Sequence, residues 1–149
     1  MAEKTFEILV INGPNLNMLG IREPAIYGND SYADLCDFIK MSALPLKLDV
    51  TLFQSNHEGA IIDEIQNALG KFDGIVINPG AYTHYSYAIA DALSAVQIPT
   101  VEVHISDISK REDFRKLSVI SPVSIATVKG KGFYGYREAL EILKGALEK

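Results

Sequence analysis

Short β-rich runs alternate with stretches of helical periodicity along the chain, and this alternation limits the folds that it can adopt. Strands that alternate with helices in this way form a parallel sheet with helices on both faces. The sequence therefore predicts an α/β protein. Five strands are expected, at Phe6–Ile11, Leu46–Phe53, Gly74–Ile77, Thr100–Val103 and Val123–Val128.

The stretches between these runs carry apolar residues at spacings of three and four. Ser31 and Asp34 predict a capping box before the first helix, and the second helix is expected to bury Ile61, Ile62, Ile65 and Leu69. Right-handed crossovers leave few topologies for such a chain. We expect one domain over residues 1–149, a flavodoxin-like three-layer sandwich whose five-stranded parallel sheet has the order 2-1-3-4-5.

Composition limits the partners of the chain. A formal net charge of −5 argues against nucleic acid, because nucleic-acid binders carry a basic surface. No apolar run is long enough to cross a membrane and no targeting segment is visible, so we expect no membrane partner and a cytoplasmic location. Cys36 is the only cysteine, and its apolar neighbours predict a reduced, buried, structural thiol.

The segments that follow the strands are rich in Asn, Gln, His and Ser and contain no acidic residue; they are Asn12–Asn15, Gln54–Asn56, Asn78–His84 and His104–Ser106. Ligands of open parallel sheets bind at these carboxyl ends. Neutral hydrogen-bonding groups suit a polyhydroxylated small molecule better than a metal ion or a triphosphate. The sequence has no P-loop motif, no G-x-G-x-x-G after the first strand and no H-x-x-x-H spacing.

Histidines and carboxylates near these ends are candidates for acid–base chemistry. His104 ends the fourth strand, two residues after Glu102. Side chains two apart on a strand share a face, so Glu102 is expected to orient the imidazole and support its charged form. His84 and Asp91 share a helix face if the third helix begins near Thr83. A solvated surface carboxylate is the open alternative for Asp91.

The segment between the first strand and the first helix resembles a surface lid and carries Arg22 and Tyr27. A neighbouring guanidinium favours the ionised form of a phenol, so closure of this segment would make Tyr27 a base. Arg111 and Arg115 are four residues apart. They either reach the strand ends or pair with nearby carboxylates on the surface.

Four motifs follow one another at the expected strand ends, and together they are similar to a known family. The chain resembles the type II 3-dehydroquinate dehydratases over nearly its full length. The motifs are Asn12–Asn17 with Arg22–Pro24 and Tyr27–Gly28, then Gln54–Gly59, Asn78–His84, and Val101–Ser106 with Arg111 and Arg115.

The resemblance implies a lyase that converts 3-dehydroquinate to 3-dehydroshikimate, in the shikimate pathway or in quinate breakdown. The family works by anti elimination of water through an enol or enolate, without a Schiff base, a metal or another cofactor. The resemblance implies that Tyr27 is the base and that Arg22 favours its phenolate. It implies that Asn15 holds a water near the enolate oxygen. His104 matches the general acid, with Glu102 beside it.

The resemblance also implies how substrate and subunits are bound. In this family the Asp91 contact can come from a neighbouring subunit, and trimers are grouped into a dodecamer, which we expect here. The implied substrate contacts are Asn78, His84, Asp91, Ile105, Ser106, Arg115 and Arg111.

Some residues depart from the family pattern. Many relatives read Ser-Asn-x-His where this chain has Asp107 and Ser109, and small residues are common at Tyr85 and Tyr87. These departures leave the rate and the subunit packing open.

Two other function classes remain open from the residues alone. A hydrolase or transferase would need Ser55 or Ser106 as its nucleophile, although neither lies in a G-x-S-x-G motif. A binding module would keep the pocket without activity, and the presence of Arg22, Tyr27 and His104 argues against it.

Overall fold

The computed structural model describes residues 5–21, 30–108 and 112–149. Within this part of the chain, five strands form one parallel sheet in the order β2-β1-β3-β4-β5, which confirms the predicted topology. The strands are β1 (Phe6–Asn12), β2 (Leu48–Gln54), β3 (Gly74–Asn78), β4 (Thr100–His104) and β5 (Ala126–Lys129).

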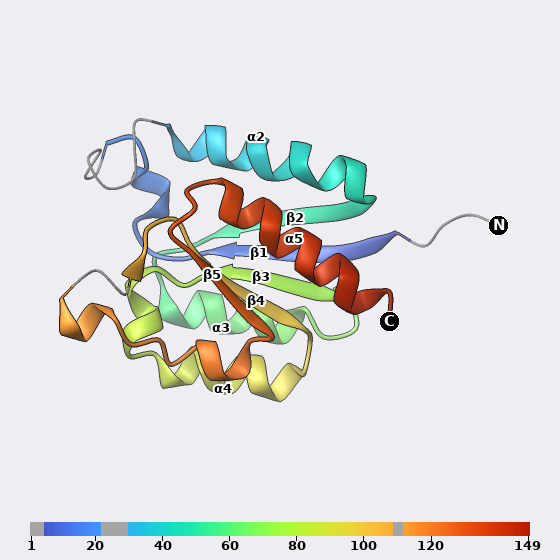
Figure 1. Ribbon diagram of the computed structural model, residues 1–149. Coiled ribbons are helices and arrows are strands. Elements are labelled where there is room, and N and C mark those ends of the chain that lie inside the picture. The colour runs from blue at the N-terminus through green and yellow to red at the C-terminus, as the bar shows by residue number, and fades with distance from the viewer. Residues whose placement is uncertain (1–4, 22–29, 109–111) are drawn as a thin grey trace.

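Helices cover both faces of the sheet, as Figure 1 shows. Helices α2 (Tyr32–Ala43) and α5 (Tyr134–Leu147) pack on one face, and α3 (Glu58–Asn67) and α4 (Tyr87–Val96) pack on the other. Successive residues of β1 point to opposite faces because the side-chain period of a strand is two. Alternate β1 side chains therefore enter the two apolar cores, Ile8 and Val10 in one and Leu9 and Ile11 in the other.

Local details differ from the sequence-based expectations in three places. The capping box at Ser31 and Asp34 is present, but α3 ends at Asn67 and leaves Leu69 63% exposed instead of buried. Strand β5 begins later than predicted, because residues Ser121–Val123 form a 3-10 turn that contains a proline. Cys36 is a free thiol but only half-buried, so the expectation of a buried thiol was wrong.

The carboxyl ends of the strands gather on the left of Figure 1, where short 3-10 helices follow them. These are η1 (Leu16–Met18) after β1, η3 (Gly80–His84) after β3 and η5 (Asp113–Arg115) between β4 and β5. The Gly13 N–H donates to the Asn78 carbonyl at 2.8 Å. A side chain at Gly13 would place its Cβ 2.7 Å from the Pro79 carbonyl oxygen, so only glycine permits this approach of the two turns.

The α helices of the described residues are too short or too polar to cross a bilayer. The longest of them, α5, has 14 residues and is amphipathic, with one face in the core and the other in solvent.

Candidate active site

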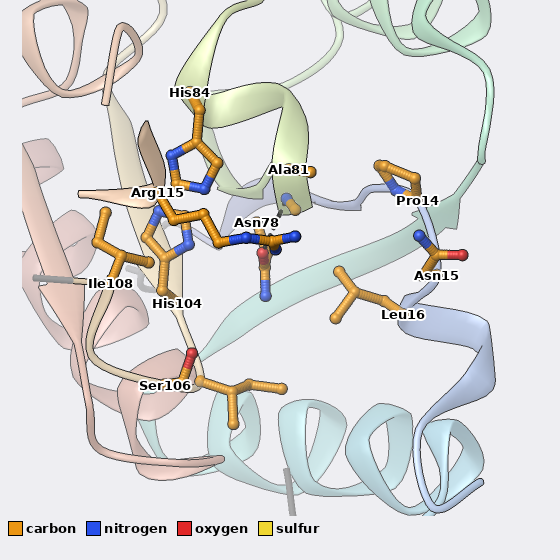
Figure 2. A pocket seen from close by; sticks show the side chains of 12 residues that line it. Pro14, Asn15, Leu16, Asn78, Ala81, His84, His104, Ser106, Ile108 and Arg115 are labelled. Carbon is orange, nitrogen blue, oxygen red and sulfur yellow. Dashed lines mark hydrogen bonds between the residues drawn. The ribbon is translucent and has the colours of Figure 1, made fainter. Parts of the chain in front are cut away.

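A hollow opens at the carboxyl ends of β1, β3 and β4, where the sequence predicted a site. It leaves about 60 Å³ that the centres of water molecules can occupy, and it continues into open solvent. In Figure 2, His84, His104 and Ile108 lie on one side of it, and Asn15 and Leu16 lie on the other. The hollow therefore has basic or polar groups on facing walls, as a small polar ligand requires.

Glu102 and His104 form a buried pair at the end of β4. The imidazole Nε2 lies 2.5 Å from Oε2 of Glu102, whose side chain is fully buried. Among the described residues no partner is recorded for the other ring nitrogen, Nδ1, and the ring lines the hollow. The contact expected from their spacing is present, and it leaves Nδ1 as the nitrogen available to a ligand.

The Glu102 carboxylate is stabilised in its charged form although it is buried. Burial alone raises its pKa, but the hydrogen bond and the charge of His104, with hydrogen bonds from Thr83 and Ser118, outweigh burial and lower the pKa below its usual value. A carboxylate at this place is therefore ionised near neutral pH. It can stabilise an imidazolium beside it.

His84 is held by a backbone carbonyl instead of a carboxylate. Its Nδ1 lies 2.7 Å from the Leu117 carbonyl oxygen. A carbonyl only accepts hydrogen bonds, so Nδ1 carries the proton and Nε2 is the acceptor of the neutral ring. The Val119 N–H also donates to the Thr83 carbonyl at 2.7 Å. These two bonds fix η3 against the segment that follows η5.

Arg115 satisfies both interpretations that the sequence left open. Its side chain lines the hollow, and its Nε also lies 2.8 Å from Oε2 of Glu112, three residues earlier. Glu112 is exposed, so this ion pair is screened by solvent and is worth little to stability. A surface salt bridge and a position at the site therefore occur together.

A buried network below the hollow orients Asn78. Its Nδ2 donates to the Tyr136 hydroxyl at 2.9 Å, and its Oδ1 accepts the Gly80 N–H at 3.1 Å. The Tyr136 hydroxyl in turn donates to Oδ1 of Asn12 at 2.6 Å. Burial raises the pKa of this phenol, so it stays a donor. One hydrogen of the Asn78 amide remains for a ligand.

Asn15 is positioned by the end of β2. Its backbone has a φ of 69°, in the left-handed region that asparagine tolerates better than most residues. Its N–H donates to Oδ1 of Asn56 at 3.0 Å. Gln54 donates to the same Oδ1 and to the Gly13 carbonyl. Residues of the Gln54–Gly59 motif therefore hold the Asn12–Asn17 motif in place.

The family described as Dehydroquinase class II matches residues 6–144. This chain belongs to that family. As a class II dehydroquinase it is 56% identical to a 3-dehydroquinate dehydratase of Clostridium acetobutylicum, over 96% of this chain and 99% of that protein. It is 58% identical to the one of Caldicellulosiruptor saccharolyticus, over 95% and 98%.

Solved structures agree with the family and with the fold. The type II dehydroquinase from Butyrivibrio crossotus has a TM-score of 0.91 to this chain at 55% identity, with 93% of this chain and 97% of that one covered. The type II dehydroquinase from Propionibacterium acnes also has a TM-score of 0.91, at 42% identity. The flavodoxin-like fold of the class II dehydroquinases is thus the fold of this chain.

The structure brings most of the site residues expected from the dehydroquinase resemblance together. Arg22, Tyr27 and Arg111 lie outside the described residues. Glu102 lies behind His104, as expected. The hollow is lined by Asn15, Asn78, His84, His104, Ile105, Ser106 and Arg115.

Asp91 is the expected site residue that the structure places elsewhere. It is exposed on α4 and does not line the hollow. The proposed helix face shared with His84 was wrong, because α4 begins at Tyr87 and His84 belongs to η3. Within one chain, the solvated carboxylate is therefore the better description of Asp91.

Sequence reasoning missed two kinds of residue at the site. Leu16 and Ile108 form apolar parts of the wall, and only their closeness to the Asn15 and Ser106 motifs could have indicated it. Ser118 and Thr127 touch Glu102 from segments far along the chain, so no local pattern marks them.

Proposed function

We propose that this class II dehydroquinase removes water from 3-dehydroquinate to give 3-dehydroshikimate, by anti elimination through an enol or enolate. The observation that carries the proposal is the buried Glu102–His104 pair, which leaves Nδ1 of an imidazole to the hollow. A protonated imidazole there can give its Nδ1 proton to a departing hydroxyl group. The carboxylate on Nε2 stabilises the positive charge until the transfer.

The roles of the other groups follow from what the elimination needs. Tyr27, as a phenolate beside Arg22, takes a proton from the carbon next to the ketone. The electron pair of that C–H bond becomes the enolate, and Asn15 holds a water against the enolate oxygen. When the C–O bond then breaks, the departing oxygen takes the His104 proton and leaves as water.

Substrate binding is proposed for groups that line the hollow and for two further residues that the family resemblance implies. Asn78, Ser106 and the backbone at Ile105 bind the carboxylate and hydroxyl groups of the substrate, and the buried network supports this because it fixes the Asn78 amide. The remaining contacts are proposed for His84, Arg115, Arg111 and, from a neighbouring subunit, Asp91.

The same proposal includes the assembly. We propose one catalytic domain over residues 1–149, assembled as trimers grouped into a dodecamer. The proposed contact of Asp91 requires such an oligomer, because among the described residues this exposed side chain does not line the hollow of its own chain. The cytoplasmic location stays a prediction of the sequence.

A spectroscopic assay for the conjugated product, with no metal or cofactor added, tests the reaction. His104→Ala and Tyr27→Phe should each lower kcat by at least about a hundredfold, the usual contribution of a positioned acid or base. His57→Ala is the matched control, because His57 is exposed and its side chain makes no capping hydrogen bond. Product formation by His104→Ala at the rate of the unmodified chain would remove His104 from the mechanism.

A further inference from the structure

Three hydroxyl groups converge on the carboxylate of Glu102, from three different parts of the chain. Ser118 donates to Oε1 and Oε2 at 2.9 and 2.8 Å, and Thr127 of β5 donates to Oε1 at 3.3 Å. Thr83 of η3 donates to Oε2, the oxygen that also contacts His104. We call Thr83, Ser118 and Thr127 the hydroxyl cage.

The bonds of Ser118 determine which way its proton points. Its oxygen accepts the N–H of Ile120 at 3.2 Å and the N–H of Ser121 at 3.0 Å. A hydroxyl oxygen has two acceptor positions and one proton. Because both acceptor positions are used by backbone donors, the proton is left for Glu102 or for the Thr83 hydroxyl, which lies 2.9 Å away and itself donates to Glu102. The cage therefore matches an ionised carboxylate, which only accepts, better than a carboxylic acid, which must also donate.

Other charges do not explain the stability of this buried carboxylate. Among the described residues, His104 is the one titratable group recorded as acting on Glu102. The other groups against it, from η3, from the segment after η5 and from β5, are the cage hydroxyls. An isolated buried carboxylate is costly unless donors stabilise it. The hydrogen bond and charge of His104 lower the pKa of Glu102 most, and the hydroxyl donors add to that stabilisation without adding a second positive charge.

We infer that the hydroxyl cage keeps Glu102 ionised and thereby keeps the transferable proton of the pair on His104. This inference rests on the proposed function, in which His104 is the acid. The shared proton can lie on the imidazole, as an ion pair, or on the carboxyl group, as a neutral pair. The cage favours the ion pair, and a neutral imidazole is a far weaker acid than an imidazolium. Thr83, Ser118 and Thr127 are positioning residues, since none lines the hollow.

The pH dependence of kcat tests the inference. Ser118→Ala and Thr83→Val should lower kcat about tenfold and move its acid limb up by about one pH unit, because a hydrogen bond to a charged group is lost. The acid limb moves to higher pH because Glu102, with fewer hydrogen-bond donors, takes up a proton at higher pH. KM should change little, because the substrate does not touch the cage. Thr127→Val should move the limb less, since its bond is the longest of the three.

Two variants separate this effect from general damage to the loop. Ser124→Ala is the matched control, because Ser124 lies in the same segment and donates to the Ile120 carbonyl instead of Glu102. It should leave the acid limb unchanged. Ser118→Thr keeps the hydroxyl and should restore the limb. An acid limb that is the same in Ser118→Ala, Thr83→Val and the unmodified chain would overturn the inference.

A direct titration distinguishes failure of the inference from failure of the proposed function. The carboxyl ¹³C shift of Glu102, followed by NMR in full-length protein, reports its ionisation whether or not the chain is an active dehydratase. Ser118→Ala should raise the midpoint of this titration, and an unchanged midpoint would contradict the cage. Thr127→Val supplies the same measurement at a half-buried position if the variant at fully buried Thr83 does not fold. An unmodified chain that produces no 3-dehydroshikimate would overturn the proposed function alone.

Discussion

Two imidazoles share the hollow, and their hydrogen-bond partners give them different chemistry. His104 has Nε2 on the Glu102 carboxylate, which stabilises an imidazolium. His84 has Nδ1 on the Leu117 carbonyl, which fixes one tautomer of the neutral ring. His104 is therefore suited to donate a proton. His84 is suited to accept a hydrogen bond from a substrate hydroxyl through Nε2.

A pair of amide variants separates the two ends of the His84 ring. In His84→Asn the amide nitrogen occupies the place of Nδ1 and keeps the bond to Leu117, but the group at Nε2 is lost. We expect KM for 3-dehydroquinate to rise about tenfold, which is roughly one lost hydrogen bond. His84→Gln places its amide near Nε2 and should retain more affinity. Steady-state kinetics measure both, and equal KM values for the two variants would contradict the assignment of Nε2 to the substrate.

Helix α5 packs on one face of the sheet, and it contributes to the site through Tyr136. The hydroxyl of this fully buried residue joins Asn12 at the end of β1 to Asn78 at the end of β3. The helix therefore does more than cover an apolar core. It fixes the amide of a residue that lines the hollow.

Tyr136→Phe should lower the free energy of unfolding by about 1–3 kcal/mol, because two buried amide groups lose their partner while the ring stays packed. Urea denaturation of the full-length protein measures the change. Tyr134→Phe is the control on the same helix, since Tyr134 is 66% exposed and its hydroxyl has access to water. Equal midpoints for the two variants would show that the buried network contributes nothing to stability.

The elements were predictable from the sequence to the extent that local signals specify them. Alternation predicted the parallel sheet, and right-handed crossovers together with the chain length predicted its order. The ends of β1, β3 and β4 predicted the location of the hollow. The start of β5 was missed because a 3-10 turn interrupts an otherwise strand-like run, and Leu69 was missed because α3 ends early. The cage could not be predicted, because Thr83, Ser118 and Thr127 meet only after the chain has folded.

Asp91 is the residue through which the proposed assembly can be tested. If its carboxylate serves the site of a neighbouring subunit, Asp91→Ala and His104→Ala damage different halves of a shared site. Each variant alone should be nearly inactive. When the two are unfolded together and refolded as mixed oligomers, some sites combine an intact His104 with an intact Asp91, and activity should return.

The control for this complementation is each variant refolded alone under the same conditions. A mixture no more active than the two separate samples would place the function of Asp91 within its own chain, or remove it from the site. Size-exclusion chromatography with light scattering measures the assembly in every sample.

Dissolved salt screens the charge of Arg115 more strongly than it screens the buried Glu102–His104 pair. At physiological ionic strength the screening length is about 8 Å, which matters for charges in contact with water. The Arg115 side chain is 32% exposed, so dissolved ions screen its attraction for an anion. The side chains of the Glu102–His104 pair are buried, with exposed fractions of 0% and 6%, so dissolved ions screen this pair much less. High salt should therefore weaken the binding of the substrate far more than it slows the elimination of water from the bound substrate.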